Sequence, residues 1–265
     1  MRAGDERRMK YGPWAVVTGA SDGIGRAIAE QLAKEGFALV LVARREERLQ
    51  EVARGMGKTA RILAVDLSEK AGWETVLRET EDLDVGLLVA AAGFGTTGEF
   101  IANPLEAELA MLATNCGGTL ALAHGFGQRM AKRGRGGMIL FSSLVAFQGV
   151  PRTANYAATK AYVQTLAEGL RRELRPKGVE VLATAPGPVR TGFGARARMQ
   201  MGMAAEVGEV ARDTLNALGR QTTVRPGGLA KLLGYSLITL PRGMRTLILE
   251  KIMAGMTRHD DESKG

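Results

Sequence analysis

Cysteine and long apolar runs are scarce in this sequence of 265 residues. Its one cysteine, Cys116, has no partner for an internal disulfide, which suits a reducing compartment. Residues 1–12 are polar and mostly basic and lack the apolar stretch of a secretory signal, so we interpret them as a ragged N-terminal extension. The chain has no run of about 18 apolar residues, which argues against a transmembrane segment. We therefore expect a cytoplasmic protein.

Aromatic residues and histidines are scarce as well. Phe, Trp and Tyr make up 5% of the chain, and one of the two histidines, His124, has no second ligand at metal spacing, so we expect no metal site. The net charge of +8 is compatible with a nucleic-acid partner or with a solvated basic surface. Because the basic residues are scattered and no aromatic stacking platform accompanies them, we favour the second interpretation and expect no nucleic-acid partner.

Short apolar runs alternate with longer helical patterns along the chain. The helical patterns cover residues 24–35, 105–132 and 155–175, and the second is expected to bend near Asn115. Apolar strands that alternate with helices are typical of a parallel sheet covered on both faces. We predict an α/β fold, a single doubly wound Rossmann-type domain over residues 13–256. The expected strands are 14–18, 38–43, 61–65, 85–90, 138–141 and 179–184.

The pattern becomes less regular after Pro186. Residues 189–207 contain several glycines and three methionines, and we interpret them as a substrate lid. The alternative is a disordered loop whose methionines only fill gaps. Residues 229–256 form helical patterns broken at Pro241; their charges argue against membrane insertion but leave weak membrane-surface association open. Residues 257–265 are expected to form a frayed polar tail.

A glycine-rich turn with the spacing G-x3-G-x-G follows the first expected strand and leads into the first helix. Glycines allow a close approach of the backbone to a phosphate, and the N–H groups at a helix start favour an anion. We interpret the turn as a cradle for a dinucleotide pyrophosphate; the alternative is an ordinary glycine-rich turn. The predicted binding residues are Gly19, Ser21, Asp22, Gly23, Ile24 and Gly25.

The end of the second strand indicates the cofactor. NAD enzymes usually place a carboxylate about 20 residues beyond the glycines to bind the ribose. Here the position is Ala43, and Arg44 follows it, which favours the 2′-phosphate of NADP(H). The alternative is that Arg44 and Arg45 start a solvated helix and pair with acidic residues. Asp22 places a negative charge near the phosphates and weakens the NADP(H) interpretation slightly.

Tyr156 and Lys160 stand four residues apart on an expected helix, so their side chains share one face. A tyrosine is a poor acid or base at its usual pKa of about 10, and a nearby ammonium lowers that pKa. Ser143, at the end of the fifth strand, could polarise a carbonyl oxygen. Tyrosine and lysine at this spacing are common in helices by chance, but their place after a strand that ends in serine makes the pattern specific.

Together these elements resemble the classical short-chain dehydrogenase/reductase family over roughly residues 13–256. The resemblance implies a single domain with a seven-stranded parallel sheet, and we place the seventh strand near residues 222–224. One departure is Ala90-Ala91-Ala92-Gly93, where the family usually has Asn-Asn-Ala-Gly, which puts the bracing of the sheet in doubt. The elements that carry the resemblance are residues 18–25, Asp66-Leu67, Ala92-Gly93, Asn115, Ser142-Ser143, Tyr156 to Lys160, and residues 186–191.

The resemblance also implies roles. Tyr156 would be the general acid or base, Lys160 would also hold the nicotinamide ribose, and Ser143 would polarise the carbonyl. The family spacing to the tyrosine selects Ser143 over the alternative, Ser142. Asn115 would bend its helix and hold a water in a proton relay. Asp66 would contact the adenine region and Thr191 the nicotinamide end, and the remaining cofactor contacts would be Leu67, Ala92, Gly93, Pro186, Gly187 and Val189.

The sequence as a whole predicts an NADP(H)-dependent oxidoreductase that interconverts a ketone or aldehyde and an alcohol, with a hydrophobic small-molecule substrate. We further expect a homo-oligomer. One alternative is a non-catalytic dinucleotide-binding or scaffold protein, because a fold does not fix a function. Another is reduction of a carbon–carbon double bond, against which the Tyr156–Lys160 spacing argues. Cys116 is expected to be a buried structural thiol rather than a nucleophile.

Overall fold

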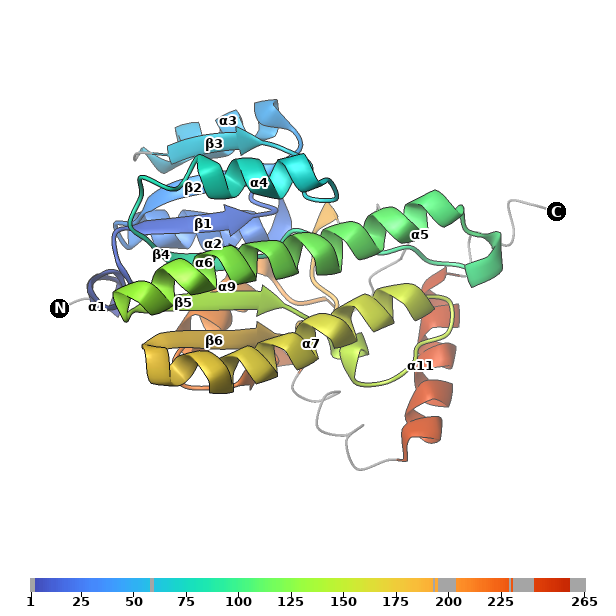
Figure 1. Ribbon diagram of the computed structural model, residues 1–265. Helices are drawn as coiled ribbons and strands as arrows, with labels where there is room; N and C mark the ends of the chain where they lie inside the picture. The colour runs from blue at the N-terminus through green and yellow to red at the C-terminus, as the bar shows by residue number, and fades with distance from the viewer. Residues whose placement is uncertain are drawn as a thin grey trace.

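Seven parallel strands form one sheet in this computed structural model, which describes residues 3–57, 60–192, 194, 204–228, 230 and 241–257 (Figure 1). The order across the sheet is β3-β2-β1-β4-β5-β6-β7. The first three strands are added toward one edge and the later strands toward the other edge, so the strand order reverses between β1 and β4. This confirms the predicted fold and the seventh strand. The strands are β1 (Trp14–Thr18), β2 (Ala38–Ala43), β3 (Ala60–Ala64), β4 (Val85–Ala90), β5 (Gly136–Phe141), β6 (Val179–Thr184) and β7 (Thr223–Val224).

Helices cover both faces of the sheet (Figure 1). On one face lie α2 (Gly23–Lys34), α3 (Glu46–Met56) and α9 (Val207–Ala217); on the other lie α4 (Lys70–Arg78), α6 (Thr119–Arg133) and α7 (Ala154–Leu174). Neighbouring strand residues point into opposite layers: Val17 packs in the first core and Val16 in the second. Burial on both sides explains why the strands read as continuous apolar runs.

The N-terminal segment is ordered, and the expectation of a ragged end is wrong there. Residues Ala3–Tyr11 form the helix α1. Tyr11 is buried and its hydroxyl donates to the Glu180 carboxylate, while Arg7 pairs with Glu35 and donates to the Leu215 carbonyl at 3.1 Å. These partners are polar and distant in sequence, so hydrophobic periodicity did not reveal the docking of this helix.

The long helical pattern before β5 is interrupted where we expected it to bend. It begins as α5 (Leu105–Leu112), passes through the π-helical turn η2 (Ala113–Gly118), which contains Asn115, and continues as α6. π-Helical turns inside α-helices are frequent at functional sites. Short 3-10 turns occur at η1 (Phe100–Ala102), η3 (Leu144–Phe147) and η4 (Arg175–Lys177), and α11 (Arg242–Thr257) is the last helix described.

Three of the predicted segments fall partly outside the described residues. For the proposed lid, the structure leaves out residues 193 and 195–203; for the segment 229–256, it leaves out 229 and 231–240; and residues 258–265 of the tail are also left out. Within the part of the chain that is described, no helix combines the length and apolar character needed to cross a membrane.

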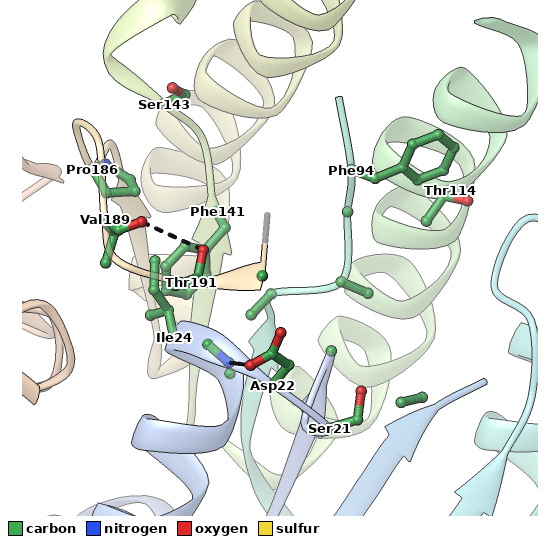
Figure 2. Close-up of a pocket in the computed structure, with 18 of the residues that line it drawn as sticks. Ser21, Asp22, Ile24, Phe94, Thr114, Phe141, Ser143, Pro186, Val189 and Thr191 are labelled. Carbon is green, nitrogen blue, oxygen red and sulfur yellow. Dashed lines mark hydrogen bonds between the residues drawn. The ribbon is translucent and has the colours of Figure 1, made fainter. Parts of the chain in front are cut away.

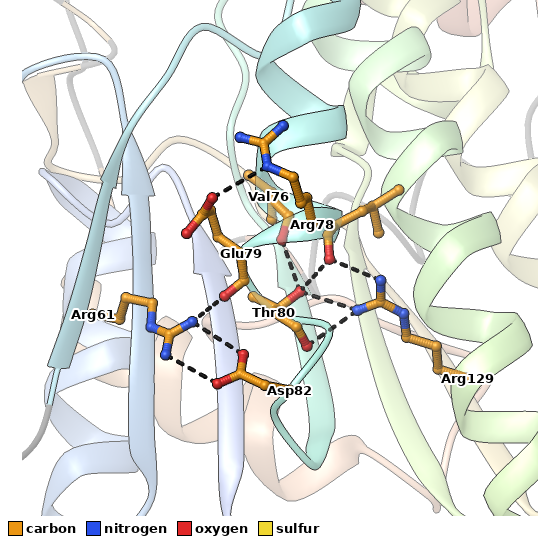
Figure 3. A network of polar contacts seen from close by, with 8 residues as sticks. Arg61, Val76, Arg78, Glu79, Thr80, Asp82 and Arg129 are labelled. Atoms are coloured by element: carbon orange, nitrogen blue, oxygen red, sulfur yellow. Dashed lines mark hydrogen bonds and ion pairs between the residues drawn. The ribbon is translucent and has the colours of Figure 1, made fainter.

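An arginine from α6 fastens the end of α4 (Figure 3). Arg129 donates to the carbonyl oxygens of Leu77 at 2.8 Å and Thr80 at 3.2 Å, and to the Thr80 hydroxyl at 3.1 Å. On the other side, Arg61 reaches the Glu79 carbonyl and pairs with Asp82 at 3.3 Å. Because the last carbonyls of a helix lack partners within the helix, the two guanidinium groups satisfy them and hold α4 between β3 and α6.

Replacing Arg129 should therefore destabilise the fold. Thr80 is fully buried, and Arg129→Ala removes the three hydrogen bonds that the guanidinium donates to Leu77 and Thr80, so we expect the free energy of unfolding to fall by about 2 kcal/mol. Urea unfolding measures this quantity. Arg78→Ala is the matched control, because Arg78 is exposed and pairs with Glu79 at 3.3 Å; it should cost less than about 0.5 kcal/mol. Equal losses in the two variants would contradict a capping role for Arg129.

Candidate active site

A cavity of about 560 Å³ lies at the carboxyl ends of the strands β1 to β6 (Figure 2). This is where open parallel sheets bind ligands, beside the point where the strand order reverses. With the exception of Asn115, every residue that the sequence analysis assigned to the site lines this cavity. They are Gly19, Ser21, Asp22, Gly23, Ile24, Gly25, Arg44, Asp66, Leu67, Ala92, Gly93, Ser143, Tyr156, Lys160, Pro186, Gly187, Val189 and Thr191.

The glycine-rich turn forms one end of the cavity at the start of α2. Gly19 has a φ of +66°, and a Cβ there would lie 2.9 Å from the Ala91 carbonyl oxygen. A Cβ on Gly25 would lie 2.4 Å from the Gly19 carbonyl oxygen, so α2 packs against the end of β1 at a distance that only glycine permits. The resulting backbone concavity at a helix N-terminus fits the pyrophosphate of a dinucleotide.

Asp22 closes the start of α2 and faces the segment after β6 (Figure 2). Its carboxylate accepts a hydrogen bond from the Gly23 amide at 2.7 Å. A Cβ on Gly192 would lie 2.4 Å from this carboxylate, and a Cβ on Gly23 would lie 2.9 Å from the Thr191 methyl group. The negative charge that we expected near the phosphates therefore also serves as the N-cap of the helix, where the helix dipole favours it.

Arg44 lines the cavity directly after β2, next to Asp66. Its guanidinium pairs with the Asp66 carboxylate at 3.6 Å. Partial burial by itself would raise the pKa of Asp66, but hydrogen bonds from the Ser68 amide (2.9 Å) and hydroxyl (2.8 Å), together with Arg44, lower it. The Arg44 side chain is half exposed, so its guanidinium is open to an anion in the cavity.

Tyr156, Lys160 and Ser143 meet where α7 passes the end of β5. Lys160 donates to the Phe141 carbonyl at 2.9 Å, and its ammonium lies 5.7 Å from the centre of the Tyr156 ring. Burial lowers the pKa of Lys160 to about 8. Burial also raises the pKa of Tyr156 to about 12, although a hydrogen bond with Ser143 opposes the rise. The expectation that the ammonium lowers the tyrosine pKa is wrong here, because removal from water disfavours the phenolate.

The two neighbouring serines have different surroundings. Ser142 is buried, and its hydroxyl donates to the Lys160 carbonyl at 3.1 Å, so it ties β5 to α7. Ser143 is the N-cap of η3, where its hydroxyl accepts from the Val145 amide at 3.4 Å, and it shares a hydrogen bond with Tyr156. This geometry supports the choice of Ser143 over Ser142 as the residue that polarises a carbonyl.

Asn115 lies behind the cavity rather than on its wall. Its amide accepts from the Phe94 amide at 3.1 Å and donates to the Phe94 carbonyl at 2.9 Å and to the Thr159 hydroxyl at 3.0 Å. The side chain thus joins the segment after β4 to α7. The water-holding role that the resemblance implies for Asn115 stays a prediction.

Thr18 braces the segment after β4, where the asparagines usual in the family are absent. Its hydroxyl, at the end of β1, accepts a hydrogen bond from the Ala92 amide at 3.0 Å. Ala92 is the third residue of the Ala90-Ala91-Ala92-Gly93 run that departs from the family pattern. One brace between the central strands is therefore present, and it comes from the neighbouring strand.

Sequence reasoning missed part of the cavity wall. The rule that ligands bind beyond the strand ends could have found the residues that directly follow strands. Phe94 and Thr114 carry no such signal, because contacts between distant segments bring them to the cavity. The additional lining residues are Val42, Ala43, Arg45, Val65, Ala91, Phe94, Thr114, Phe141, Ser142, Leu144, Val145, Pro188 and Gly192.

Cys116 has the surroundings that we expected of a structural thiol. It is buried, its sulfur donates to the Thr159 carbonyl at 3.7 Å, and burial raises its pKa to about 11. A thiol with such a pKa is a weak nucleophile at neutral pH. Among the described residues, no three His, Cys, Asp or Glu side chains gather where they could hold a metal ion.

Comparisons with known proteins agree with this architecture. A model of the family described as "short chain dehydrogenase" matches residues 13–202. The 7beta-hydroxysteroid dehydrogenase of Clostridium sardiniense is 36% identical over 188 residues, which cover 69% of this chain and 72% of that protein.

Solved structures extend the likeness over most of the fold. One from work on 7beta-hydroxysteroid dehydrogenase stereoselectivity has a TM-score of 0.85 at 26% identity and covers 91% of this chain and 98% of its own. A short-chain dehydrogenase from Sphingobium yanoikuyae in complex with NADPH has a TM-score of 0.77 at 30% identity and covers 86% of this chain and 93% of its own.

Proposed function

Because the chain belongs to the short-chain dehydrogenase family and is thus an oxidoreductase of alcohol and carbonyl groups, we propose that it uses NADP(H) on a hydrophobic ketone or aldehyde and the corresponding alcohol. One observation carries the proposal. The cavity that begins at the glycine-rich turn also contains the hydrogen-bonded pair of Tyr156 and Ser143. A dinucleotide held at the turn and a carbonyl held at Tyr156 would therefore share one cavity.

The chain's own residues supply the proton and orient the substrate. When bound, the nicotinamide supplies or accepts a hydride at the reacting carbon. In the reducing direction the Tyr156 hydroxyl donates its proton to the carbonyl oxygen, and the Ser143 hydroxyl polarises that oxygen. With a pKa raised to about 12, Tyr156 carries its proton at neutral pH, as a general acid requires. Lys160, buried beside the ring, provides a positive charge near the phenolate left by proton transfer.

Three observations support NADP(H) over NAD(H). Arg44 lies at the rim of the cavity directly after β2, where a 2′-phosphate would approach. The relative from Sphingobium yanoikuyae has a solved structure with NADPH. The position before Arg44 is Ala43, which offers no carboxylate to the ribose hydroxyls.

The walls near Tyr156 support a hydrophobic substrate. Phe94, Leu144, Val145 and Pro186 contribute apolar surface to the same cavity. Relatives named as hydroxysteroid dehydrogenases point in the same direction. The lid role of residues 189–207, the cytoplasmic location and the homo-oligomeric state stay predictions.

A panel of carbonyl compounds tests the proposal. NADPH oxidation should be measured with cyclohexanone, a fused bicyclic ketone, a steroid ketone and a ketose sugar. We expect kcat/KM to rise with apolar size, because each buried CH₂ group contributes about 0.8 kcal/mol to binding. Preference for the sugar would contradict the hydrophobic substrate class. The absence of turnover with all four compounds and with matching aldehydes would contradict the proposed function.

A further inference from the structure

A buried carboxylate that lies outside the cavity joins two of the segments that form the cavity wall. Glu108 lies on α5 with only 5% of its surface exposed. One of its carboxylate oxygens accepts from the Thr96 hydroxyl at 2.7 Å and from the Asn103 amide at 2.9 Å. The other accepts from the Asn155 amide at 2.7 Å. A buried carboxylate needs several donors, and three neutral side chains provide them here.

The first segment held by Glu108 is the irregular stretch between β4 and α5. Thr96 and Asn103 stand near its two ends, and both bind the same carboxylate oxygen. Phe94, which lines the cavity, lies in the first part of this stretch and is fixed by Asn115. The stretch forms few regular backbone hydrogen bonds, so its path past the cavity depends on these side-chain contacts.

The second segment is the first turn of α7. Asn155 donates to the Glu108 carboxylate and also to the Glu108 backbone carbonyl at 3.1 Å. The N-cap residue of α7, Thr153, forms no side-chain capping hydrogen bond, so the carboxylate supplies negative charge beside this helix start. The Gly98 amide donates to the Arg152 carbonyl at 3.0 Å, which adds a backbone contact between the two segments. Tyr156 directly follows Asn155.

We propose that Glu108 is a positioning residue for Tyr156. Through Asn155 it fixes the start of α7, and through Thr96 and Asn103 it holds the stretch between β4 and α5 that contributes Phe94 to the cavity wall; Tyr156 is thereby fixed relative to that wall. Glu108 does not line the cavity, so it acts through these partners. This inference rests on the proposed role of Tyr156 as the acid. Proton transfer requires the donor hydroxyl within hydrogen-bond reach of the substrate oxygen, and small displacements of a catalytic group are costly.

Variants that break one contact at a time separate the effect of the Glu108–Asn155 contact from that of the Glu108–Thr96 contact. Asn155→Ala releases the start of α7, and we expect kcat for ketone reduction to fall about tenfold while the Kd of NADPH stays within about twofold. Thr96→Val releases the wall, and we expect it to raise KM for the ketone severalfold with kcat nearly unchanged. Glu108→Leu, which keeps the size of the side chain but has no acceptor oxygen, should show both effects, and adding Asn155→Ala to it should lower kcat no further. Glu106→Leu, the same change at an exposed position of α5, should change none of them.

A purely structural role gives a different result. Glu108→Leu and Asn155→Ala would then lower the melting temperature but leave kcat of the folded enzyme unchanged, and that result would overturn the proposal. Losses in kcat that multiply in the double variant would also overturn it, because the two residues would then act independently.

Amide hydrogen exchange tests the inference separately from the proposed function. In Glu108→Leu, exchange should accelerate in both residues 94–103 and residues 153–158, and Glu106→Leu should match the parent chain. Unchanged exchange in either segment overturns the positioning role of Glu108. If the parent chain reduces no carbonyl compound while exchange changes as expected, the proposed function fails and the structural link holds.

Discussion

Tyr156→Phe should lower the rate of carbonyl reduction by at least about 100-fold, in line with the loss of a general acid. Phenylalanine keeps the ring packing and removes only the transferable proton and its hydrogen bond with Ser143. Burial raises the pKa of Tyr156 to about 12, so at pH 7 nearly all of the enzyme carries the proton that this variant lacks. Single-turnover oxidation of bound NADPH by a ketone measures the chemical step directly.

Tyr162→Phe is the matched control for this variant. Tyr162 lies on the same helix, α7, but 40% of its surface is exposed and it does not line the cavity, so its turnover should equal that of the parent enzyme. Fluorescence titration should give the same Kd for NADPH in all three proteins, because neither substitution removes a phosphate contact. Normal turnover in Tyr156→Phe would overturn the mechanism, and lost NADPH binding would show that the variant acts through the cofactor site.

The sequence predicted the strands well because both faces of the sheet are covered. Runs such as Val85–Ala90 are fully buried, and their bounds follow from their apolar residues. β5 was expected only from Met138, because Gly136 and Gly137 have no side chains that indicate a strand. Their pairing with Val179 and Glu180 of β6 extends the strand, and that pairing is a tertiary contact that local patterns do not contain.

The candidate site was predictable where a residue type at a fixed spacing carries the signal, as with Tyr156 and Lys160. It was not predictable where the surroundings in the fold determine a residue's pKa or its burial. Sequence spacing places an ammonium near Tyr156, but burial controls the pKa of both groups in the fold. Glu108 was also missed, because its donors Thr96 and Asn155 stand 12 and 47 positions away in the chain. A glutamate in a short helix whose leucines are mostly exposed gives no sign in the sequence that it is buried.

Arg44→Ala should weaken NADPH binding at least about tenfold and leave NADH binding nearly unchanged, because only NADPH presents the 2′-phosphate. A hydrogen bond to a charged group contributes about 1.5–3 kcal/mol. Before a cofactor binds, the Arg44 guanidinium forms an ion pair with the Asp66 carboxylate at 3.6 Å, and both side chains are partly exposed. Such a surface ion pair contributes at most about 1 kcal/mol. The free energy lost when Arg44 exchanges Asp66 for a phosphate is therefore smaller than the free energy gained from the hydrogen bond to the phosphate.

The neighbouring charges set the size of the effect and its control. Without Arg44, the Asp66 carboxylate would face the 2′-phosphate uncompensated, which adds repulsion to the lost attraction. The matched control is Arg48→Ala, since Arg48 lies on α3 close to Arg44 in the chain but pairs with Glu51 at 2.9 Å and does not line the cavity. It should change neither dissociation constant. Titration of the parent chain and both variants with NADPH and NADH decides the matter: equal affinities in the parent, or equal losses in Arg44→Ala, would show that Arg44 is only a surface charge and that cofactor choice lies elsewhere.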